Sequence, residues 1–391
     1  MSRPLEHLTV LDLTRLLPGG YCTLLLADLG ADVLKIEEPG KGDCIRWMPP
    51  MVGDVAAGHL ALNRGKRSMT LNLKSPEGVE VFRRLARDAD VVVESFRPGV
   101  MDRLGVGFDA LVEINPRIVF CAISGYGQTG PYRDRAGHDI NYTGFAGLLD
   151  IIGERARGPV VPGVQIGDLG GGGLMAAVGI LAALAERERT GRGRMVDISM
   201  TDGAFSWLSI HGQAYALTGE VPRRGLMRLS GELACYRVYR CSDDRWVTVG
   251  ALEPQFWEAL CTALGVPELI ERQFSPTEEQ DLMAEKLAQI FVTRSRDEWV
   301  AELADLDACV GPVKDFEEAF SDEQLRARDM VVEVPTSHGM MRAIGNPVRL
   351  VGDEPGPPRP APGFGEHTDE TLRAIGFDDA EVAKLREARA I

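Results

Sequence analysis

A chain of 391 residues is long for a single hydrophobic core, so its length predicts two domains. Hydrophobic residues make up 45% of the chain and charged residues 26%, as in ordinary globular proteins. The net charge of −15 argues against non-specific nucleic-acid binding, which needs a basic surface, although a local basic cluster can still hold an anionic ligand.

The sequence is not expected to carry a targeting or membrane segment. Its first residues, MSRPLEHLTVLDLT, lack the charged, apolar and small-residue regions of a signal peptide. The apolar stretch 174–185 is shorter than the ~20 residues that span a membrane, and it ends in ERER. Seven cysteines are scattered without a CxxC pair, which predicts reduced thiols and argues against a disulfide framework or a zinc site. We therefore expect a cytoplasmic protein without a bound metal.

Strand and helix patterns alternate along the first part of the chain. The LLPGG segment at 16–20 predicts a turn, and Ser75 followed by Pro76 predicts the start of a helix. The expected strands are 9–14, 31–39, 68–73, 90–96 and 117–124, with helices at 21–30 and 75–89. This repeated strand–helix–strand order predicts an α/β fold, a Rossmann-like domain with a parallel sheet and helices on both faces.

Such a fold raises the question of a nicotinamide cofactor. The first turn reads TRLLPGG and lacks the GxGxxG spacing that cradles a pyrophosphate, although Glu37 or Glu38 is placed like a ribose-binding acid. The sequence therefore still predicts a Rossmann-like fold, but it argues against a bound dinucleotide cofactor.

The second half of the chain predicts a smaller α+β domain. Its expected elements are a helical stretch at 201–222, an antiparallel hairpin of strands at 236–243 and 245–252, and helices at 255–265, 278–294 and 296–306. A Pro/Gly-rich connector at 345–369 and a last helical piece at 369–390 follow. The expected domains are a large α/β domain at 1–200 completed by 335–391, a linker helix at 201–224 and a small domain at 225–330.

Two candidate proton-handling residues, His138 and Asp168, lie between Gly137 and Leu174. Asp168 precedes a glycine run and an apolar segment that predicts a buried helix, with Asp168 at or near its N-cap and Gly191 just past its end. A histidine titrates near neutrality, and burial can raise the pKa of a carboxyl into the same range. Because a helix N-terminus favours developing negative charge, the set predicts carbanion or acyl chemistry.

Three motifs carry a resemblance to a known family. They are GHDINY at 137–142, Asp168 with its glycine-rich helix start, and LEPQF at 252–256. On these motifs the chain resembles the α-methylacyl-CoA racemases of the type III CoA-transferase (CaiB/BaiF) family over nearly its whole length. The resemblance implies an interlocked homodimer, with each active site between the large domain of one subunit and the small domain of the other. It also implies that coenzyme A carries the substrate, and we expect no other cofactor.

The resemblance also implies roles for individual residues. His138, Asp168 and Glu253 match the acid/base set that takes the α-proton of a 2-methylacyl-CoA thioester and returns it on the opposite face. The enolate oxygen would then point at the backbone N–H of Asp168 and its neighbours. Such an α-proton is weakly acidic, so its removal needs both a positioned base and stabilisation of that oxygen. The expected activity is racemase or epimerase chemistry by 1,1-proton transfer.

Basic residues near the ends of the expected strands predict where the phosphates of coenzyme A bind. Ligands of open α/β sheets bind outside the carboxyl ends of the strands, where we expect these residues to lie. The loop GYGQTGP at 125–131 resembles the one that approaches the pantetheine arm, and Tyr142 is expected to line the thioester pocket. The candidate contacts are Arg64, Arg67, Lys74, Arg97, Arg103, Gly125 and Tyr142, with Lys66 in the same basic segment.

Two other functions use the same residues differently. A type III CoA transferase would use Asp168 as a nucleophile, forming an acyl anhydride and then an aspartyl-CoA thioester, without a need for His138. Such enzymes shield the intermediate with a glycine-rich loop, where this chain has RLSGELACY with Gly231 alone, whereas HDINY and LEPQF favour the racemase. A non-catalytic CoA-ester-binding protein would need an inactive site, yet all three expected acid/base residues are present.

Overall fold

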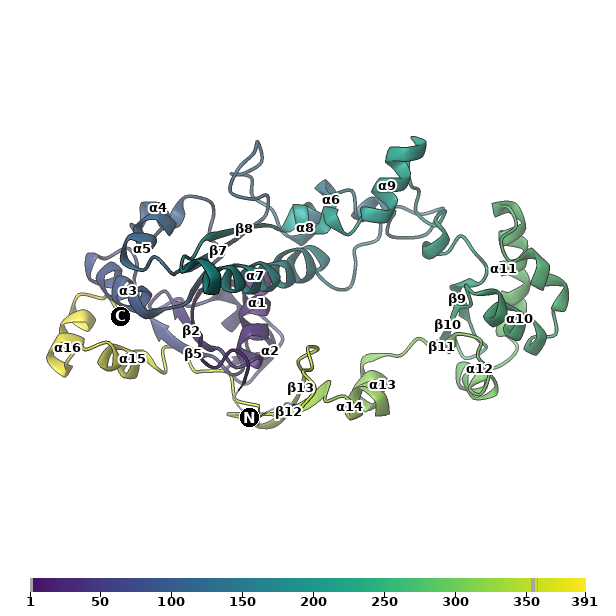
Figure 1. Ribbon diagram of the computed structural model, residues 1–391. Helices are drawn as coiled ribbons and strands as arrows, with labels where there is room; N and C mark the ends of the chain where they lie inside the picture. Colours follow the sequence, from purple (N-terminus) through teal and green to yellow (C-terminus); the bar gives the residue numbers. More distant parts are fainter. Residues whose placement is uncertain (1–2, 353–355, 357) are drawn as a thin grey trace. The chain divides into compact units, whose positions relative to one another are not determined.

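The computed structural model describes residues 3–352, 356 and 358–391, and the chain divides into two compact units (Figure 1). The first unit comprises Met1–Ala146, Gly163–Trp207 and Glu323–Ile391, and the second comprises Gly147–Pro162 and Leu208–Asp322. The segment 147–162 thus belongs to the second unit, whereas the predicted bounds include it in the large domain. Residues 353–355 and 357 of the predicted connector lie outside the described residues.

The first unit is built on a six-stranded parallel sheet, which confirms the predicted sheet type. The strand order is β5-β2-β1-β6-β7-β8, and every neighbouring pair is parallel. This is the order of doubly wound folds, in which the direction of winding reverses between β1 and β6. The strands are β1 (Thr9–Leu13), β2 (Asp32–Glu37), β5 (Arg67–Thr70), β6 (Val91–Glu94), β7 (Val119–Ser124) and β8 (Met195–Ser199).

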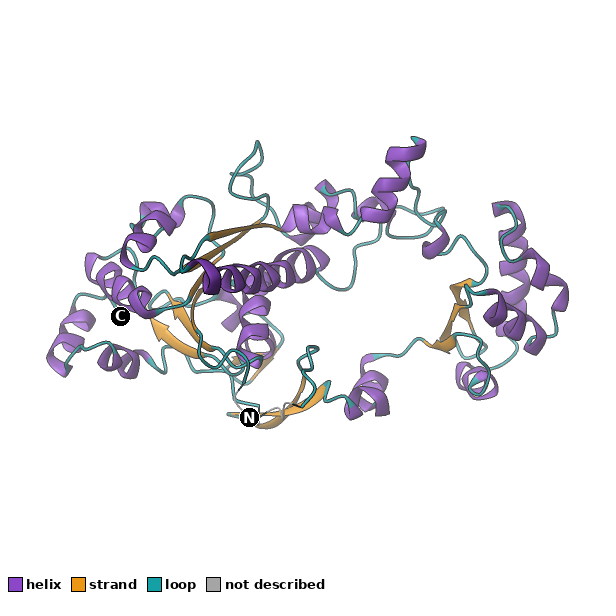
Figure 2. Ribbon diagram, viewed as in Figure 1, coloured by secondary structure: helices purple, strands orange, loops and turns teal. Residues whose placement is uncertain are grey.

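Helices cover both faces of this sheet (Figure 2). Neighbouring residues of a strand point to opposite faces, so Val10 packs with α1 and α7 while Leu11 packs with the helices of the other face. The helices of the first face are α1 (Leu16–Asp28) and α7 (Met175–Thr190). Those of the second are α3 (Pro76–Asp88), α5 (Phe108–Ile114), α15 (Thr368–Ala374) and α16 (Asp379–Glu387). The C-terminal helices α15 and α16 therefore complete the core of the first unit.

Local sequence signals place several helix ends. The Ser75 hydroxyl accepts a hydrogen bond from the Gly78 N–H and caps α3, and α7 ends at Gly191 with φ of 70°, as predicted. The predicted LLPGG turn is wrong, because α1 begins at Leu16 and takes these residues into its first turn. Pro18 fits there because the first N–H groups of a helix have no partner within it.

One helical segment, Ile166–Thr190, is long and apolar enough to cross a membrane by length and composition. In this structure it contributes Ala176, Ala177 and Ile180 to the core that also holds residues of β1 and β7. The segment therefore serves as a core helix of the first unit.

The second unit contains a small antiparallel sheet of order β11-β10-β9. The predicted hairpin of β9 and β10 is confirmed, and its turn holds Asp244 at φ of 62°. Helices pack on this sheet around a core that includes Trp257, Phe291 and Trp299. The elements are β9 (Tyr236–Arg240), β10 (Trp246–Gly250), β11 (Val310–Pro312), α9 (Ser209–Thr218), α10 (Pro254–Ala263), α11 (Thr277–Phe291), α12 (Arg296–Leu303) and α13 (Phe316–Ser321).

Shorter elements complete the first unit. They are α2 (Ala57–Asn63), α4 (Val100–Arg103), α6 (Asp139–Phe145), α8 (Met200–Ser206), α14 (Glu323–Ala327) and the hairpins β3 (Met51–Val52) with β4 (Val55–Ala56) and β12 (Val331–Thr336) with β13 (Gly339–Ile344). The β12–β13 hairpin and β8 were not predicted. The expected helical stretch 201–222 is two helices, α8 and α9, which belong to different units.

Candidate active site

His138 immediately precedes α6, and the Asn141 side chain holds its backbone there. Its N–H donates to Asn141 Oδ1 at 3.0 Å, and its side chain is exposed. Gly137 leaves no room for a side chain, because a Cβ there would lie 2.7 Å from a ring carbon of Tyr142 and 3.0 Å from the Tyr126 hydroxyl. The Tyr142 hydroxyl donates a hydrogen bond to the Gly137 carbonyl. Tyr142 and Tyr126 thus pack against Gly137 and support the backbone directly before His138.

Asp168 comes from a distant segment and meets the His138 loop. Its backbone N–H donates to Asp139 Oδ1 at 2.9 Å. Burial raises the pKa of the Asp168 carboxyl to about 6, the negative charge of Asp139 adds to this rise, and His138 opposes it. The fold therefore brings the two predicted proton-handling residues together and gives the carboxyl a pKa suited to exchange near neutrality.

The helix that carries Asp168 differs from the prediction. Asp168 lies in the first turn of a π-helix, η3 (Ile166–Leu174), whose N-cap is Gln165, so it stands near the helix start as predicted, but this start comes earlier in the chain than expected. The Asp168 N–H, expected to face an enolate oxygen, already has Asp139 as its acceptor. A substrate oxygen that used this N–H would have to displace the Asp139 carboxylate.

The glycine run allows two helices to approach η3 at backbone distance. A Cβ on Gly171 would lie 2.7 Å from the Met200 carbonyl oxygen of α8, and one on Gly173 would lie 2.6 Å from the Pro18 carbonyl oxygen of α1. Because these contacts are to backbone atoms, a larger residue would push the helices apart. Wide helical turns of this kind often occur at functional sites.

Tyr142 and Gly125 pack against one another. A Cβ on Gly125 would lie 2.4 Å from a ring carbon of Tyr142, whose side chain is buried. Burial raises the pKa of the Tyr142 hydroxyl to about 12, so this group stays protonated at neutral pH. In this structure the Tyr142 side chain supports the loop before His138.

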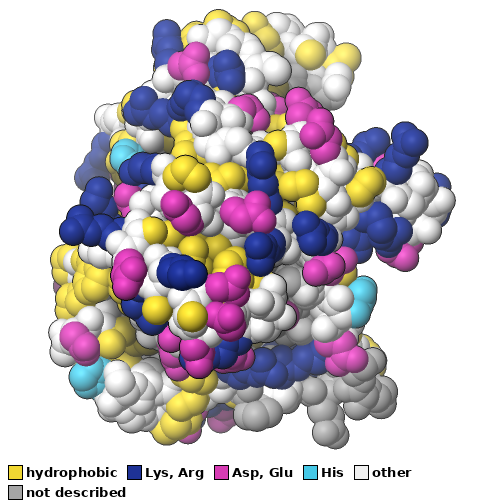
Figure 3. Space-filling view, turned by 90° about the vertical axis from the view of Figure 1, so that its left-hand side faces the viewer, with side chains coloured by type: hydrophobic (Ala, Val, Ile, Leu, Met, Phe, Trp, Pro, Cys, Tyr) yellow, Lys and Arg dark blue, Asp and Glu magenta, His cyan; other side chains and the backbone are white. Residues whose placement is uncertain are grey.

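Figure 3 shows one face of the molecule on which Lys and Arg side chains are interspersed with Asp and Glu, so cations for an anionic ligand must be sought in a local cluster. A cavity of about 240 Å³ lies at the carboxyl edge of the sheet, where the winding reverses. Arg15 after β1, Glu38 after β2, Lys74 after β5 and Phe96 after β6 line it. The Arg15 guanidinium lies 5.4 Å from the centre of the Phe96 ring.

The predicted cations divide between this cavity and other places. Lys74 lines both the cavity and an adjoining groove of about 500 Å³, which also includes Arg103. Arg97 is exposed three residues past the end of β6, and its positive charge acts to lower the pKa of the Tyr142 hydroxyl. These three residues follow the carboxyl ends of strands, as expected for ligand contacts.

Three other cations lie elsewhere. Arg67 begins β5 and pairs with Asp32, which begins β2, at 2.7 Å. Because the strands are parallel, both residues lie at the amino edge of the sheet, and the predicted placement of Arg67 at the carboxyl ends is wrong. Arg64 pairs with Asp28 near the end of α1, and the buried Lys66 is 3.2 Å from a carboxylate oxygen of Asp12.

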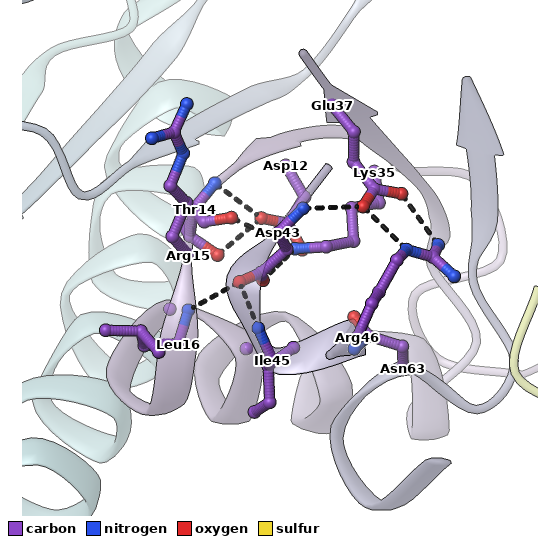
Figure 4. A network of polar contacts seen from close by, with 12 residues as sticks. Asp12, Thr14, Arg15, Leu16, Lys35, Glu37, Asp43, Ile45, Arg46 and Asn63 are labelled. Carbon is purple, nitrogen blue, oxygen red and sulfur yellow. Dashed lines mark hydrogen bonds and ion pairs between the residues drawn. The ribbon is translucent and has the colours of Figure 1, made fainter. Parts of the chain in front are cut away.

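A buried network of charges lies beneath the cavity (Figure 4). Lys35 Nζ is 3.0 Å from Asp43 Oδ2 and donates to the Thr14 carbonyl at 3.0 Å. The Asp43 carboxylate also accepts from the Leu16 N–H at 3.2 Å. These bonds tie the loop after β1, which carries Arg15, to the segment that follows β2.

Full burial of these charges requires close compensation. Burial alone would raise the pKa of Asp12, but Lys35 and Lys66 outweigh it and lower that pKa to about 2. Burial likewise opposes the charge of Lys35, yet Asp12 and Asp43 raise the pKa of this ammonium. Asp12 and Lys35 are therefore both ionised at neutral pH, and the stability of the buried network depends on its ion pairs.

Glu253, the third predicted acid/base residue, belongs to the second unit. It directly precedes α10, with Pro254 in the first position of that helix, and its side chain is exposed. Its carbonyl accepts hydrogen bonds from the Phe256 and Trp257 N–H groups. This is the helix-start position that the residue order Glu-Pro also predicts.

Sequence reasoning missed several residues of the cavity. Arg15 and Phe96 were not singled out, although both lie at the carboxyl ends of the two predicted strands between which the winding reverses. Their position after β1 and β6 was the available signal, but the neighbouring strand order had to be known before it could be used. The contact between Asp139 and Asp168 joins residues far apart in the chain, so only the tertiary structure shows it.

The fold and these two sites define a class of α/β protein. It combines a ligand cavity at the switch point of a doubly wound sheet with a histidine–carboxylate centre at a glycine-rich helix.

Comparison with known proteins identifies the family. The chain belongs to CoA-transferase family III, whose model matches residues 5–368. It is 39% identical to an acyl-CoA transferase of Fusarium pseudograminearum, over 98% of this chain and 87% of that protein. It is 36% identical to the α-methylacyl-CoA racemase of Homo sapiens, over 99% of this chain and 97% of that protein. A CAIB/BAIF family protein from Brucella suis has the same fold, with a TM-score of 0.85 and 32% identity over 96% of this chain and all of that one.

Proposed function

We propose that this protein inverts the α-carbon of 2-methylacyl-CoA thioesters. The observation that supports it is an Asp168 carboxyl whose pKa is raised to about 6 by burial and by Asp139, and which lies close enough to His138 for that residue to oppose the rise. Inversion needs one group that takes a proton and another that gives one, both near neutral pH. A nucleophilic role needs the ionised carboxylate, which a pKa of about 6 also supplies at neutral pH, so the reaction products decide between the two functions.

The proposed reaction moves one proton at a time. One group of the pair takes the α-proton, the C–H bond breaks, and its electron pair moves toward the thioester carbonyl to form an enolate. The other group then donates its proton to the opposite face, and the enolate electron pair forms the new C–H bond. Solvent exchange resets the pair. These steps use neither a metal nor a redox cofactor, and we propose that Glu253 stabilises the charged form of His138.

We further propose that the cavity at the switch point holds the nucleotide part of coenzyme A. Its position at the carboxyl edge of the sheet and its cations Arg15 and Lys74 support this assignment, since phosphates need charged donors.

A pair of substitutions tests this site. Lys74→Ala is expected to weaken CoA binding roughly tenfold, because it removes a charged donor at the cavity. Arg67→Ala, the matched control, should leave the affinity unchanged, because Arg67 pairs with Asp32 at the amino edge. Isothermal titration calorimetry at one fixed ionic strength measures both. Equal losses in the two variants would contradict the assignment.

The resemblance-based expectation of a homodimer also stays a proposal. The apolar side chains of Ile210 and Leu217 on α9 are 75% and 78% exposed, which fits a surface that a second copy covers. Analytical ultracentrifugation that finds only a monomer at micromolar concentration would remove this proposal.

Deuterium incorporation tests the activity itself. A single enantiomer of a 2-methylacyl-CoA is incubated with the protein in D₂O, without any acceptor acid, and analysed by mass spectrometry and chiral separation. Uptake of one deuterium at the α-carbon with loss of optical purity is the expected result. A lack of uptake for all 2-methylacyl esters tried would contradict it.

The alternative is CoA transfer, and the similarity to the Fusarium acyl-CoA transferase favours it specifically. In that reaction the Asp168 carboxylate attacks the thioester carbonyl and the CoA thiolate leaves, which forms a mixed anhydride. The thiolate then attacks the aspartyl carbonyl and releases the acid. New CoA esters formed on addition of carboxylic acids, together with hydroxylamine trapping at Asp168, would establish this function.

A further inference from the structure

Glu38 places a carboxylate among the cations of the switch-point cavity. Its Oε1 is 2.9 Å from Lys74 Nζ and 3.8 Å from Lys41 Nζ, and its Oε2 is 3.5 Å from an Arg15 guanidinium nitrogen. The side chain of Glu38 is 23% exposed and lines the cavity together with Arg15 and Lys74. One acidic group thus contacts three cations that come from different segments of the chain.

These segments converge because of the sheet topology. Arg15 follows β1, Lys41 follows β2 and Lys74 follows β5, and these three strands are neighbours in the parallel sheet. The hydrogen bond from Lys74 is the main reason that the pKa of Glu38 lies below its ordinary value, so the carboxylate is ionised at neutral pH. A ligand phosphate that used these cations would meet a negative charge already bound to them.

We infer that Glu38 is an internal competitor for the phosphate groups of the nucleotide part of coenzyme A. It holds Arg15 and Lys74 at the cavity, and Lys41 beside it, and gives these cations up when a phosphate takes its place. This inference rests on the proposed CoA binding at the cavity. Phosphate displaces the carboxylate because it carries more charge and more acceptor oxygens. As the ligand leaves, the returning carboxylate re-pairs the cations and speeds release.

Competition of this kind has a distinct signature. It acts on ligands that need the cations and not on ligands that lack a phosphate, whose binding leaves the Glu38 pairs intact. It is also electrostatic between partly exposed groups, so it weakens as salt screens the charges. A residue that directly bonds the ligand would show the opposite sign, because its removal would weaken binding.

The test compares wild-type protein with Glu38→Gln by calorimetry at low ionic strength. The probes are CoA, adenosine 3′,5′-bisphosphate and adenosine. Loss of the competitor is expected to tighten binding of the first two roughly three- to tenfold and to leave adenosine unchanged. The gain should shrink with added salt, and the CoA dissociation rate should fall by a similar factor. Glu38→Ala should give the same gain, since the effect comes from lost charge.

Two further variants separate competition from other effects. Glu188→Gln removes an exposed carboxylate that pairs with Arg117 in the same unit, so it makes the same change in net charge, and CoA affinity should not change. In a Lys74→Ala background the gain from Glu38→Gln should be smaller, because Glu38 has lost its nearest cation.

Each outcome decides between the two proposals. Unchanged or weaker binding of CoA by both Glu38 variants would overturn the inference alone, and weaker binding would make Glu38 a ligand contact. A wild-type protein that binds neither CoA nor the bisphosphate would overturn the proposed CoA site together with the inference.

Discussion

An Asp168→Asn enzyme is expected to invert 2-methylacyl-CoA roughly 10²–10⁴ times more slowly than the wild type, because it loses one of two proton-transfer groups. Deuterium exchange should persist on one enantiomer, since His138 still takes and returns a proton on its own side. In the His138→Ala enzyme, deuterium exchange should instead persist on the other enantiomer. The measurement is deuterium uptake in D₂O on each enantiomer separately, beside the rate of inversion.

The pH dependence adds an independent check on the same pair. The active form of the pair holds one proton, so kcat/KM should fall both at low pH, where both groups are protonated, and at high pH, where neither is. Inversion consumes no net proton, so kcat/KM should have the same pH profile whichever enantiomer is the substrate. Burial and then Asp139 raise the pKa of Asp168 to about 6. Asp139→Asn removes that negative charge, lowers the proton affinity of Asp168, and should move the acid limb to lower pH.

A nearby substitution controls for general effects on the loop. Asp134→Asn changes an exposed carboxyl four residues before His138 and should leave rates and profile unchanged. Exchange of both enantiomers by both single variants would remove these residues from the proton transfers. Loss of acyl transfer in Asp168→Asn, without any exchange in the wild type, would point to the nucleophile role.

The second large effect is on stability, at the buried network beneath the cavity. Lys35→Met keeps the length of the side chain but leaves Asp43 buried without its cation and removes the bond to the Thr14 carbonyl. The free energy of unfolding of the first unit is expected to fall by about 3–5 kcal/mol, the usual cost of breaking a buried pair. Hydrogen exchange of the β1 and β2 amides measures this for the first unit, which a single unfolding midpoint of a two-unit chain would not resolve.

A double variant separates lost charge pairing from lost packing. Lys35→Met with Asp43→Asn removes both charges and should recover much of the loss, because no unpaired ion is left. Lys384→Met on the exposed side of α16 should change stability by no more than about 0.5 kcal/mol. A double variant as unstable as the single one would show that packing, and not the ion pair, accounts for the effect.

The network also predicts acid sensitivity of the first unit. The pKa of Asp12 is lowered in the folded state to about 2, mainly because Lys35 and Lys66 outweigh its burial. A carboxyl with a depressed folded pKa stabilises the fold above its unfolded pKa, about 3.8, and loses that contribution as pH falls toward 2. The stabilisation by Asp12 should therefore be complete at neutral pH and disappear between about pH 4 and pH 2.

Much of the local structure followed from short-range patterns. Buried strands such as β6 show as apolar runs, and Ser75, Pro76 and Gly191 mark helix ends by chemistry that acts within a few residues. The π-helix at Asp168 was not predicted, because its wide turns depend on the backbone of α1 and α8 against Gly171 and Gly173. Likewise LLPGG reads as a turn but continues into α1.

By itself the sequence determined the α/β class, the parallel sheet, and His138 and Asp168 as the residues to examine, because periodicity and contiguous motifs are local properties of the chain. Only the tertiary structure decided which cations share a cavity, that Arg67 lies at the amino edge beside Asp32, and that Glu38 stands among Arg15, Lys41 and Lys74. The physical reason is strand order. The neighbours of β1 are set by long-range pairing, and that pairing determines which loops meet at the carboxyl edge of the sheet.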